Sequence, residues 1–248
     1  MKRTAELGLS SDFQAKAVLT EVTMILITGA SSGLGAALAA LYAKENEPLT
    51  LTGRNTERLH TVANALTPFS TQSIAAIAAD LTSESSLEAL FDGLTATPKT
   101  VIHCAGSGYF GAIETQGVRD IQSLLNSNVT STILLVRELV KRYKDQAVTV
   151  VIVMSTAALA AKAGESTYCA AKWAVRGFVE SVRLELKQSP MKLIAVYPGG
   201  MDTGFWPSSG KTLDTTNFMS ADEAAGMLKQ ALIATQHGYI ADITIQRG

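Results

Sequence analysis

Short apolar segments alternate with amphipathic ones from Met24 onward. Val148–Met154 is continuously apolar and rich in β-branched residues, which is typical of a parallel strand buried on both faces. Ser85–Glu88 and Ser220–Glu223 have the Ser-x-x-Glu form of a capping box, which predicts that a helix begins at each. The apolar segments predict strands at Met24–Thr28, Leu49–Thr52, Ile74–Ala79, Thr100–Cys104, Val148–Met154, Lys192–Tyr197 and Tyr239–Gln246.

Helical patterns fill the intervals between these strands. Val118–Lys144 predicts one long helix, whereas Met201–Phe218 is rich in Gly, Ser, Thr and Pro and is interpreted as a loop. Strands that alternate with helices throughout indicate an α/β fold with a doubly wound parallel sheet of about seven strands. The other predicted helices are Gly33–Ala43, Asn55–Leu66, Ser85–Leu94, Ser166–Lys187 and Ser220–Thr235.

The composition is that of one compact domain. Of the 248 residues 47% are hydrophobic and 17% charged, so a large core is available and intrinsic disorder is excluded. A formal net charge of -1 argues against a broad basic face for nucleic acid or an anionic membrane. The two cysteines, Cys104 and Cys169, offer neither a disulfide framework nor a clustered metal site, which favours a reducing, cytoplasmic location.

The segment before the first predicted strand has a different character. Residues 1–23 mix charged residues with short apolar pieces and contain no continuous signal-peptide core. The run Val150–Met154 is far shorter than the ~20 residues that span a bilayer. We therefore expect a soluble protein whose domain covers residues 24–248, preceded by an extension, residues 1–23, that is disordered or non-native.

Three glycines follow the first predicted strand in the order Gly-x-x-x-Gly-x-Gly. Glycine allows a tight turn and a close approach of the backbone to a pyrophosphate, and the helix that begins here offers free N–H groups. A P-loop is disfavoured because no Lys-Ser/Thr pair follows the last glycine. The loop predicts a dinucleotide site, with an ordinary glycine-rich turn as the alternative; its residues are Gly29, Ser31, Ser32, Gly33, Leu34 and Gly35.

The end of the second predicted strand bears on which dinucleotide binds. An acidic residue here would accept a hydrogen bond from the ribose 2′-hydroxyl of NAD, but the sequence has Gly53-Arg54-Asn55 and no carboxylate. A guanidinium binds a 2′-phosphate through two hydrogen bonds. Arg54 therefore favours NADP(H) over NAD(H), and the alternative is a solvated arginine at a helix start.

Tyr168 and Lys172 lie four residues apart at the start of a predicted helix, so their side chains share one face. A nearby ammonium favours the phenolate and brings a tyrosine, whose ordinary pKa is ~10, toward acid/base work at neutral pH. Ser155 follows the predicted central strand, at the sheet edge where open α/β sheets bind ligands. Each signal is weak alone, and together with the glycine loop they become strong.

These residues make the sequence resemble the single-domain short-chain dehydrogenase/reductase family over nearly all of Met24–Gly248. The resemblance implies a Rossmann fold and an NAD(P)-dependent oxidoreductase that transfers a hydride between nicotinamide and a carbonyl or alcohol, with NADPH-dependent carbonyl reduction favoured. The features that match the family are the loop Thr28–Gly35, Asp80-Leu81, Ala105-Gly106, Asn128, Ser155, Tyr168, Lys172, Pro198-Gly199 and Thr203.

The resemblance also implies catalytic roles. Tyr168 would be the general acid or base, and Ser155 would hydrogen bond the carbonyl oxygen. Lys172 would hold the nicotinamide ribose and lower the pKa of the tyrosine, and Asn128 would anchor a water in a proton relay to Lys172.

Further positions would contact the cofactor. Asp80 would contact the adenine amino group with Leu81 nearby, and Thr203 would engage the carboxamide. Ala105, Gly106, Pro198 and Gly199 would complete the site, and no metal is implied.

The sequence departs from the family at one position. The family usually has Asn-Ala-Gly after the fourth strand, and Cys104 stands where that asparagine is expected. The asparagine stabilises the end of the sheet, so we expect local hydrogen bonding to change and activity to survive. His103 is interpreted as a packed strand residue rather than a catalyst, and both cysteines as small buried side chains.

The segments that border the nicotinamide have an aromatic, apolar character, which suggests an uncharged, moderately apolar carbonyl or alcohol. The loop after Thr203 is short for a lid. The aromatic residues are Tyr109, Phe110, Phe205 and Trp206, and small wall residues are expected at Ala157, Ala158, Leu159 and Ala163.

Three other functions stay open from the sequence. A regulatory protein that senses NADP without turnover would need the glycine loop but not a tuned phenol. An isomerase or dehydratase would keep the same tyrosine and loop. A Ser–Lys hydrolase is disfavoured because Ser155 lacks a Gly-x-Ser-x-Gly elbow. By family analogy we expect a homodimer or homotetramer that uses the two long helices Val118–Lys144 and Ser166–Lys187.

Overall fold

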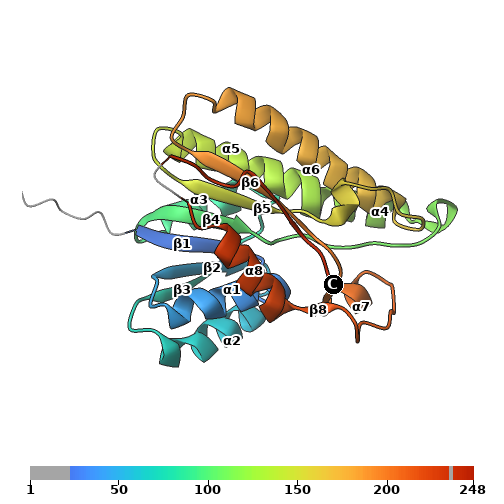
Figure 1. Ribbon diagram of the computed structural model, residues 1–248, viewed down its shortest axis with the longest axis horizontal. Coiled ribbons are helices and arrows are strands. Elements are labelled where there is room, and N and C mark those ends of the chain that lie inside the picture. Colours follow the sequence, from blue (N-terminus) through green and yellow to red (C-terminus); the bar gives the residue numbers. More distant parts are fainter. Residues whose placement is uncertain (1–22, 235–236) are drawn as a thin grey trace, which may run out of the picture.

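A parallel sheet of seven strands forms the centre of the molecule, in the order β3-β2-β1-β4-β5-β6-β9 (Figure 1). The computed structural model describes residues 23–234 and 237–248. The doubly wound parallel sheet expected from the sequence is confirmed. Its strands are β1 (Thr23–Thr28), β2 (Leu49–Gly53), β3 (Ile74–Ala78), β4 (Thr97–His103), β5 (Thr149–Val153), β6 (Lys192–Pro198) and β9 (Asp242–Ile245).

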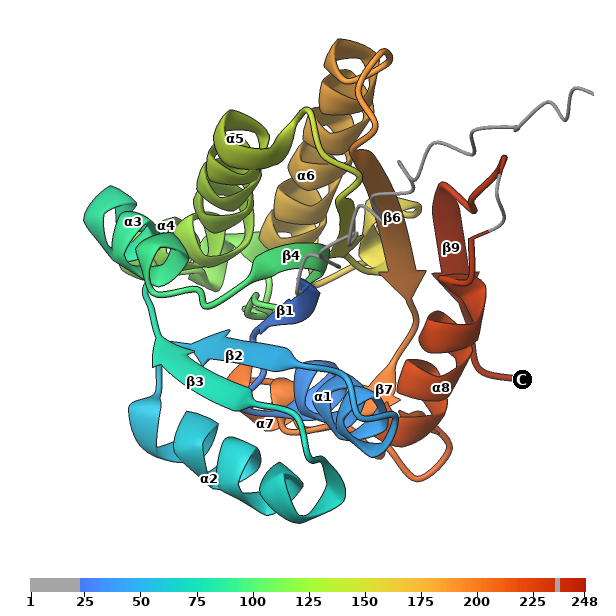
Figure 2. The ribbon, with the colours of Figure 1, turned by 90° about the vertical axis from the view of Figure 1, so that its left-hand side faces the viewer.

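Helices cover both faces of this sheet, as Figure 2 shows. One face packs under α3 (Glu84–Asp92), α5 (Ser131–Tyr143) and α6 (Ser166–Glu185). The other packs under α1 (Gly33–Lys44), α2 (Thr56–Leu66) and α8 (Ala221–Ala231). The central strands are apolar on both faces because each face needs its own core.

Because all seven strands are parallel, their carboxyl ends meet at one edge of the sheet. The register pairs Thr28 of β1 with Thr52 of β2 and with His103 of β4, and His103 in turn with Ile152 of β5. Chain order reverses between β1 and β4, and ligands of open α/β sheets bind at such a reversal. Loops that follow β1, β4 and β5 therefore start side by side.

The long helix predicted over Val118–Lys144 is interrupted. It consists of α4 (Val118–Leu125), a π-helical turn at Asn126–Thr130, and α5. In the turn the Ser131 N–H donates to the Asn126 carbonyl, five residues back. Hydrophobic periodicity does not reveal the turn because one extra residue displaces the apolar stripe by about 100°, which is comparable to the width of the stripe itself.

Other boundaries also differ from the sequence prediction. Ser83, rather than Ser85, caps α3 by accepting from the Ser86 N–H, whereas the capping box at Ser220 is confirmed. The predicted loop Met201–Phe218 contains α7 (Phe205–Ser208), and β7 (Met201–Asp202) before it pairs with β8 (Met219–Ser220).

Two further points concern the ends of the domain and the membrane. Apart from Thr23, which begins β1, the expected extension at residues 1–23 lies outside the described residues. Within the described ranges, no helix is long and apolar enough to cross a membrane.

Candidate active site

The carboxyl edge of the sheet brings most of the predicted site residues together. Gly29, Arg54, Ala105 and Ser155 follow β1, β2, β4 and β5 by one or two residues, and Pro198 ends β6. Residues far apart in the sequence thus share one edge because each directly follows a parallel strand.

The loop between β1 and α1 is built for close backbone contacts. Gly29 has a φ of +67°, and a Cβ there would lie 2.6 Å from the Ala105 nitrogen. A Cβ on Gly35 would lie 2.5 Å from the Gly29 carbonyl oxygen. Ser32 caps α1 without a side-chain hydrogen bond, and the first turn contains no acidic residue. The first N–H groups of α1 thus have neither a cap from the Ser32 side chain nor an acidic neighbour in the first turn, an arrangement that suits binding of a pyrophosphate.

Arg54 and Asp80 lie near each other beside this loop, and both are exposed. Hydrogen bonds from the backbone and side chain of Thr82 lower the pKa of Asp80, and the charge of Arg54 lowers it further. Leu81 is buried. A Cβ on Gly53 would lie 3.4 Å from the Ser31 hydroxyl, so the glycine loop borders the segment that carries Arg54.

Thr203, which follows β7, lies close to the glycine loop at Gly33. A Cβ on Gly33 would lie 3.7 Å from the Thr203 methyl carbon. The Gly199 N–H donates to the Ile245 carbonyl at 2.7 Å, which fixes the end of β6 against β9. The free helix N-terminus, the glycine backbone and the exposed guanidinium together form a donor set that fits a phosphorylated dinucleotide.

Tyr168, Lys172 and Ser155 gather beneath this edge. Tyr168 and Lys172 are each 6% exposed, and the Lys172 nitrogen lies 5.6 Å from the centroid of the Tyr168 ring. Ser155 begins a 3₁₀ turn, Thr156–Ala158, and its hydroxyl accepts from the Ala157 N–H at 3.1 Å. The structure thus brings together the three residues predicted to share the chemistry.

Burial dominates the pKa values here. It raises the pKa of Tyr168, a hydrogen bond from Ser155 lowers it, and the charge of Glu165 raises it. The net rise in the pKa of Tyr168 differs from the lowering that the Tyr168–Lys172 spacing suggested, because the effect of burial on the phenolate outweighs that of the hydrogen bond from Ser155. Burial also lowers the pKa of Lys172 to about 8, against a smaller opposing effect of Cys104.

Asn128 lies in the π-helical turn and is 1% exposed. Its side-chain nitrogen donates to the carbonyls of Ser107 at 2.9 Å and Leu124 at 3.0 Å. Its Oδ1 is a buried atom for which the described residues supply no hydrogen-bond partner. A Cβ on Gly106 would lie 2.8 Å from this oxygen and 3.5 Å from the Lys172 nitrogen, so both groups face the same small space.

Phe110, Phe205 and Trp206 form an aromatic cover over Tyr168. Phe110 meets the Tyr168 ring edge-on with a centroid distance of 5.3 Å, and Phe205 lies 5.9 Å from it. Trp206 packs 5.9 Å from Phe110 and donates its indole N–H to the Met201 carbonyl. Two of the aromatic residues predicted to border the site, Phe110 and Phe205, thus pack directly against the Tyr168 ring.

An ion pair that no sequence pattern predicts stabilises the cover. Lys211 donates to Glu165 at 3.1 Å, and the Glu165 side chain is only 8% exposed. The Lys211 nitrogen also lies 5.4 Å from the Phe110 ring centroid. The two partners are 46 residues apart in the chain, so neither periodicity nor a local motif connects them.

The expected wall of small residues is only partly present. Ala157 is fully buried and packs with Tyr168, but Ala158 belongs to the core under α6 and cannot line the site. Leu159 is 37% exposed. Cys169 is buried as expected, whereas Cys104 is only partly so, and burial of its thiol raises its pKa to about 12.

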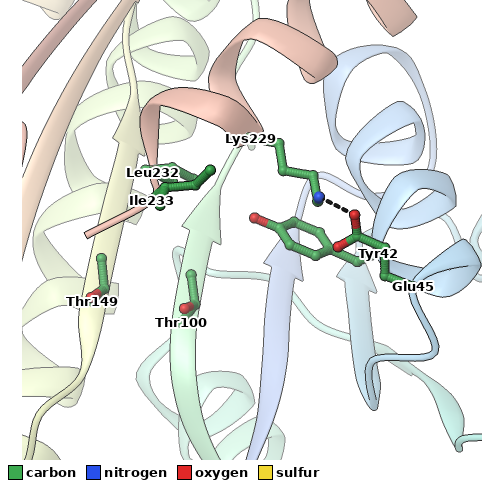
Figure 3. Close-up of a pocket in the computed structure, with 7 residues that line it drawn as sticks. All are labelled: Tyr42, Glu45, Thr100, Thr149, Lys229, Leu232 and Ile233. Atoms are coloured by element: carbon green, nitrogen blue, oxygen red, sulfur yellow. Dashed lines mark hydrogen bonds and ion pairs between the residues drawn. The ribbon is translucent and has the colours of Figure 1, made fainter. Parts of the chain in front are cut away.

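A hollow of about 220 Å³ lies at the opposite, amino edge of the sheet (Figure 3). It is lined by Tyr42, Thr100, Thr149 and the ion pair of Lys229 with Glu45, all distant from the strand ends that carry Ser155 and Gly29. None of the residues predicted for catalysis or cofactor binding lines this hollow. Across the described ranges, no three His, Cys, Asp or Glu side chains gather as metal ligands would.

A parallel doubly wound sheet with a glycine loop at its chain reversal is typical of α/β proteins that bind dinucleotides. Comparison with known proteins specifies the family. The family model described as short chain dehydrogenase matches residues 23–214. The chain therefore belongs to the short-chain dehydrogenase family of oxidoreductases.

Individual relatives agree with this assignment. The chain is 52% identical to a short-chain dehydrogenase/reductase of known structure from Vibrio parahaemolyticus, with a TM-score of 0.82 and coverage of 91% of this chain and 100% of that one. A short-chain dehydrogenase from Sphingobium yanoikuyae, solved in complex with NADPH, is 26% identical with a TM-score of 0.79, covering 90% and 87%. An uncharacterized oxidoreductase of Staphylococcus aureus is 28% identical over 92% of this chain and 98% of its own length.

Proposed function

We propose that the protein is an NADPH-dependent carbonyl reductase in which Tyr168 is the general acid. The observation that carries this proposal is the burial of Tyr168 beside Ser155 and Lys172, at the sheet edge that also holds the glycine loop. The substrate class is an uncharged, moderately apolar aldehyde or ketone, because the space next to Tyr168 is bordered by the aromatic cover.

The preference for NADPH rests on Arg54. Its guanidinium is exposed at the end of β2, and no carboxylate occupies the Gly53-Arg54-Asn55 turn. The relative from Sphingobium yanoikuyae with bound NADPH supports the same cofactor class. Gly29, Ser31, Ser32, Gly33, Leu34 and Gly35 would hold the pyrophosphate, and Asp80, Leu81, Ala105, Gly106, Pro198, Gly199 and Thr203 would border the rest of the cofactor.

The residues named above would hold NADPH, which when bound would supply a hydride to the carbonyl carbon. The Ser155 hydroxyl donates a hydrogen bond to the carbonyl oxygen and orients it. Tyr168 donates its phenolic proton to that oxygen, so the product is an alcohol and the tyrosine is left as phenolate. The positive charge of Lys172 stabilises this phenolate, and Asn128 Oδ1 holds a water that returns a proton through Lys172.

The alternatives have less support. A Ser–Lys hydrolase needs Ser155 to give its proton to Lys172, whereas the Ser155 hydroxyl is hydrogen bonded to Tyr168. A cofactor sensor without turnover has no use for a buried tyrosine, lysine and asparagine around one space. An isomerase or dehydratase would use the same residues, and net consumption of NADPH separates it from a reductase.

The test is NADPH consumption with a panel of aldehydes, ketones and diketones. We expect steady turnover with at least one class, and loss of kcat by about 10³-fold in Tyr168→Phe because the general acid is removed while the ring stays. Thermal unfolding of Tyr168→Phe would show that the fold is intact. Unchanged turnover in this variant would contradict the mechanism, and cofactor binding without turnover on the panel would favour a sensor.

We also propose that the chain forms a homo-oligomer through its long helices. Val118 is 71% exposed on α4, and Leu184 is 77% exposed on α6. Single exposed apolar side chains are common on monomers, so the proposal rests on the analogy with the family and on these two helices as the expected contact surface. Light scattering that shows only monomer would contradict this.

A further inference from the structure

Four buried polar residues form one continuous hydrogen-bond chain beside the candidate site. The Thr28 hydroxyl lies 2.7 Å from His103 Nδ1, and His103 Nε2 lies 3.0 Å from the Thr132 hydroxyl. The Thr132 hydroxyl in turn lies 2.6 Å from the main-chain carbonyl of Asn128. All four residues are at most 2% exposed, so water does not compete for these bonds.

The direction of the chain follows from its last bond. A carbonyl only accepts, so the Thr132 hydroxyl donates its single proton to Asn128 and must accept from His103. The proton of a neutral His103 is therefore on Nε2, and Nδ1 accepts from Thr28. Burial, with a smaller contribution from Lys172, lowers the pKa of His103 to about 3, so the ring stays neutral throughout the pH range of an assay.

The chain ends on an irregular part of the helix. The carbonyls of the π-helical turn Asn126–Thr130 accept from residues five positions later instead of four, as the Asn126 carbonyl does from the Ser131 N–H. Two side chains also donate to carbonyls of this turn. The Ser131 hydroxyl donates to the Ser127 carbonyl at 2.8 Å, and the Thr132 hydroxyl donates to the Asn128 carbonyl. Of these two bonds, the one from Thr132 continues through His103 to the sheet.

The turn carries the atom that the proposed proton relay uses. Asn128 Oδ1 is buried, lacks a partner among the described residues, and faces the space beside Gly106 and Lys172. A shift of its backbone would therefore move Oδ1 relative to the Lys172 nitrogen. Because β4 also carries Ala105 and Gly106 just beyond His103, the same strand would anchor both sides of this space.

We infer that His103 is a positioning residue: through Thr132 it ties the Asn128 carbonyl to the sheet and so holds Asn128 Oδ1 toward Lys172. This inference rests on the proposed function and extends it to a residue outside the reacting groups. His103 touches neither substrate nor cofactor in this role. It acts by fixing the backbone of a turn that would otherwise be free to take the α-helical hydrogen-bond pattern.

Two polar substitutions separate this role from simple space filling. The amide nitrogen of glutamine occupies nearly the position of His Nε2 and can still donate to Thr132, whereas that of asparagine corresponds to Nδ1 and reaches only Thr28. We expect His103→Gln to stay within about twofold of wild-type kcat and His103→Asn to lose about tenfold, the effect of one buried hydrogen bond. The apparent Kd for NADPH should not change in either variant.

Thr132→Val and Thr52→Val form a matched pair. Both remove a buried threonine hydroxyl beside the same sheet, but the Thr52 hydroxyl has no partner among the described residues, whereas that of Thr132 links His103 to Asn128. Thr132→Val should lower kcat about tenfold, and Thr52→Val should leave it unchanged. Hydrogen exchange of the amides of residues 126–132 should speed up about tenfold in Thr132→Val and His103→Asn only.

Three results would overturn the inference. These are wild-type kcat and exchange in both His103→Asn and Thr132→Val, equal losses in His103→Gln and His103→Asn, or a loss in Thr52→Val as large as in Thr132→Val. If the wild-type protein binds NADPH but reduces nothing on the carbonyl panel, the proposed function fails. Hydrogen exchange then decides the positioning role alone, since it measures the turn and needs no turnover.

Discussion

The glycine loop and the aromatic cover lie at the same edge of the sheet, but they are held in place by different kinds of contact. The loop is shaped by backbone: Gly29 approaches the backbone of Ala105, and Gly35 approaches the carbonyl of Gly29. The cover is shaped by side chains from three distant segments, which carry Phe110, Glu165, and the group Phe205, Trp206 and Lys211.

The two regions also differ in what they bring to a reaction. The loop, together with exposed Arg54 and Asp80, presents donors and charge to solvent. The cover excludes solvent from Tyr168 and thereby raises the pKa of the phenol. Cofactor recognition thus depends on a fixed backbone, whereas substrate selection depends on packing that a few side chains can change. Three substitutions test this division.

The largest effect is expected from Gly29→Ala. A Cβ would meet backbone atoms of Cys104 and Ala105 at 2.6 to 2.8 Å, in a backbone conformation with φ of +67°. We expect NADPH affinity to fall by at least about 100-fold and the free energy of unfolding to fall by about 3 kcal/mol, since strain and overpacking add. Fluorescence titration and denaturant unfolding measure the two effects.

Gly164→Ala is the control for this substitution. Gly164 has a φ of +74°, but nothing lies within 4 Å of the Cβ position. It should therefore show only the conformational strain, about 1 kcal/mol, and full NADPH affinity. Equal effects at the two glycines would mean that the crowding at Gly29 does not matter.

A smaller effect is expected from Arg54→Ala. Loss of a guanidinium that binds a 2′-phosphate should weaken NADPH binding about 10- to 100-fold and leave NADH binding nearly unchanged. Arg119→Ala removes the same charge from an exposed position on α4 and should change neither affinity. Parallel loss of NADPH and NADH binding in Arg54→Ala would assign the arginine to structure rather than to phosphate recognition.

The smallest effect is expected at the cover. Phe110→Ala removes the ring that lies edge-on to Tyr168 and should enlarge the space for substrate without touching the glycine loop. The ratio of kcat/KM for bulky against small ketones should rise about tenfold, while NADPH affinity stays the same. Phe69→Ala, at a side chain that is 56% exposed, is the control. A loss of NADPH affinity in Phe110→Ala would show that the two regions are coupled.

The same division explains how far the sequence could predict the structure. The seven strands and the glycine loop can be predicted from local patterns, since a buried parallel strand or a Gly-x-x-x-Gly-x-Gly turn is formed by consecutive residues. The place of Ser155 follows from the rule that strand ends of a parallel sheet meet at one edge, and the pairing of Tyr168 with Lys172 from their spacing on one helix. That the three residues meet is implied by the family resemblance.

Features that depend on contacts between residues distant in the chain could not be predicted from the sequence. The partners of His103 are Thr28 and Thr132, which lie 75 and 29 residues away, so the sequence predicts a packed side chain but not its hydrogen bonds. The rise in the pKa of Tyr168 depends on rings that fold over it. The composition of Met201–Phe218 predicts a plain loop, because α7 and the β7–β8 pair are too short to show periodicity.

The π-helical turn makes chain length itself a determinant of this site. A turn of this kind holds one residue more than the α-helix it interrupts. If one residue of Asn126–Thr130 were deleted, α4 and α5 would join as one regular helix, and side chains on one side of the junction would rotate by about 100° relative to the other. Deleting one residue here would turn either the Asn128 side chain or the apolar face of α5 away from its present contacts, although the segment would stay equally hydrophobic. A substitution, which keeps the chain length, cannot produce this rotation.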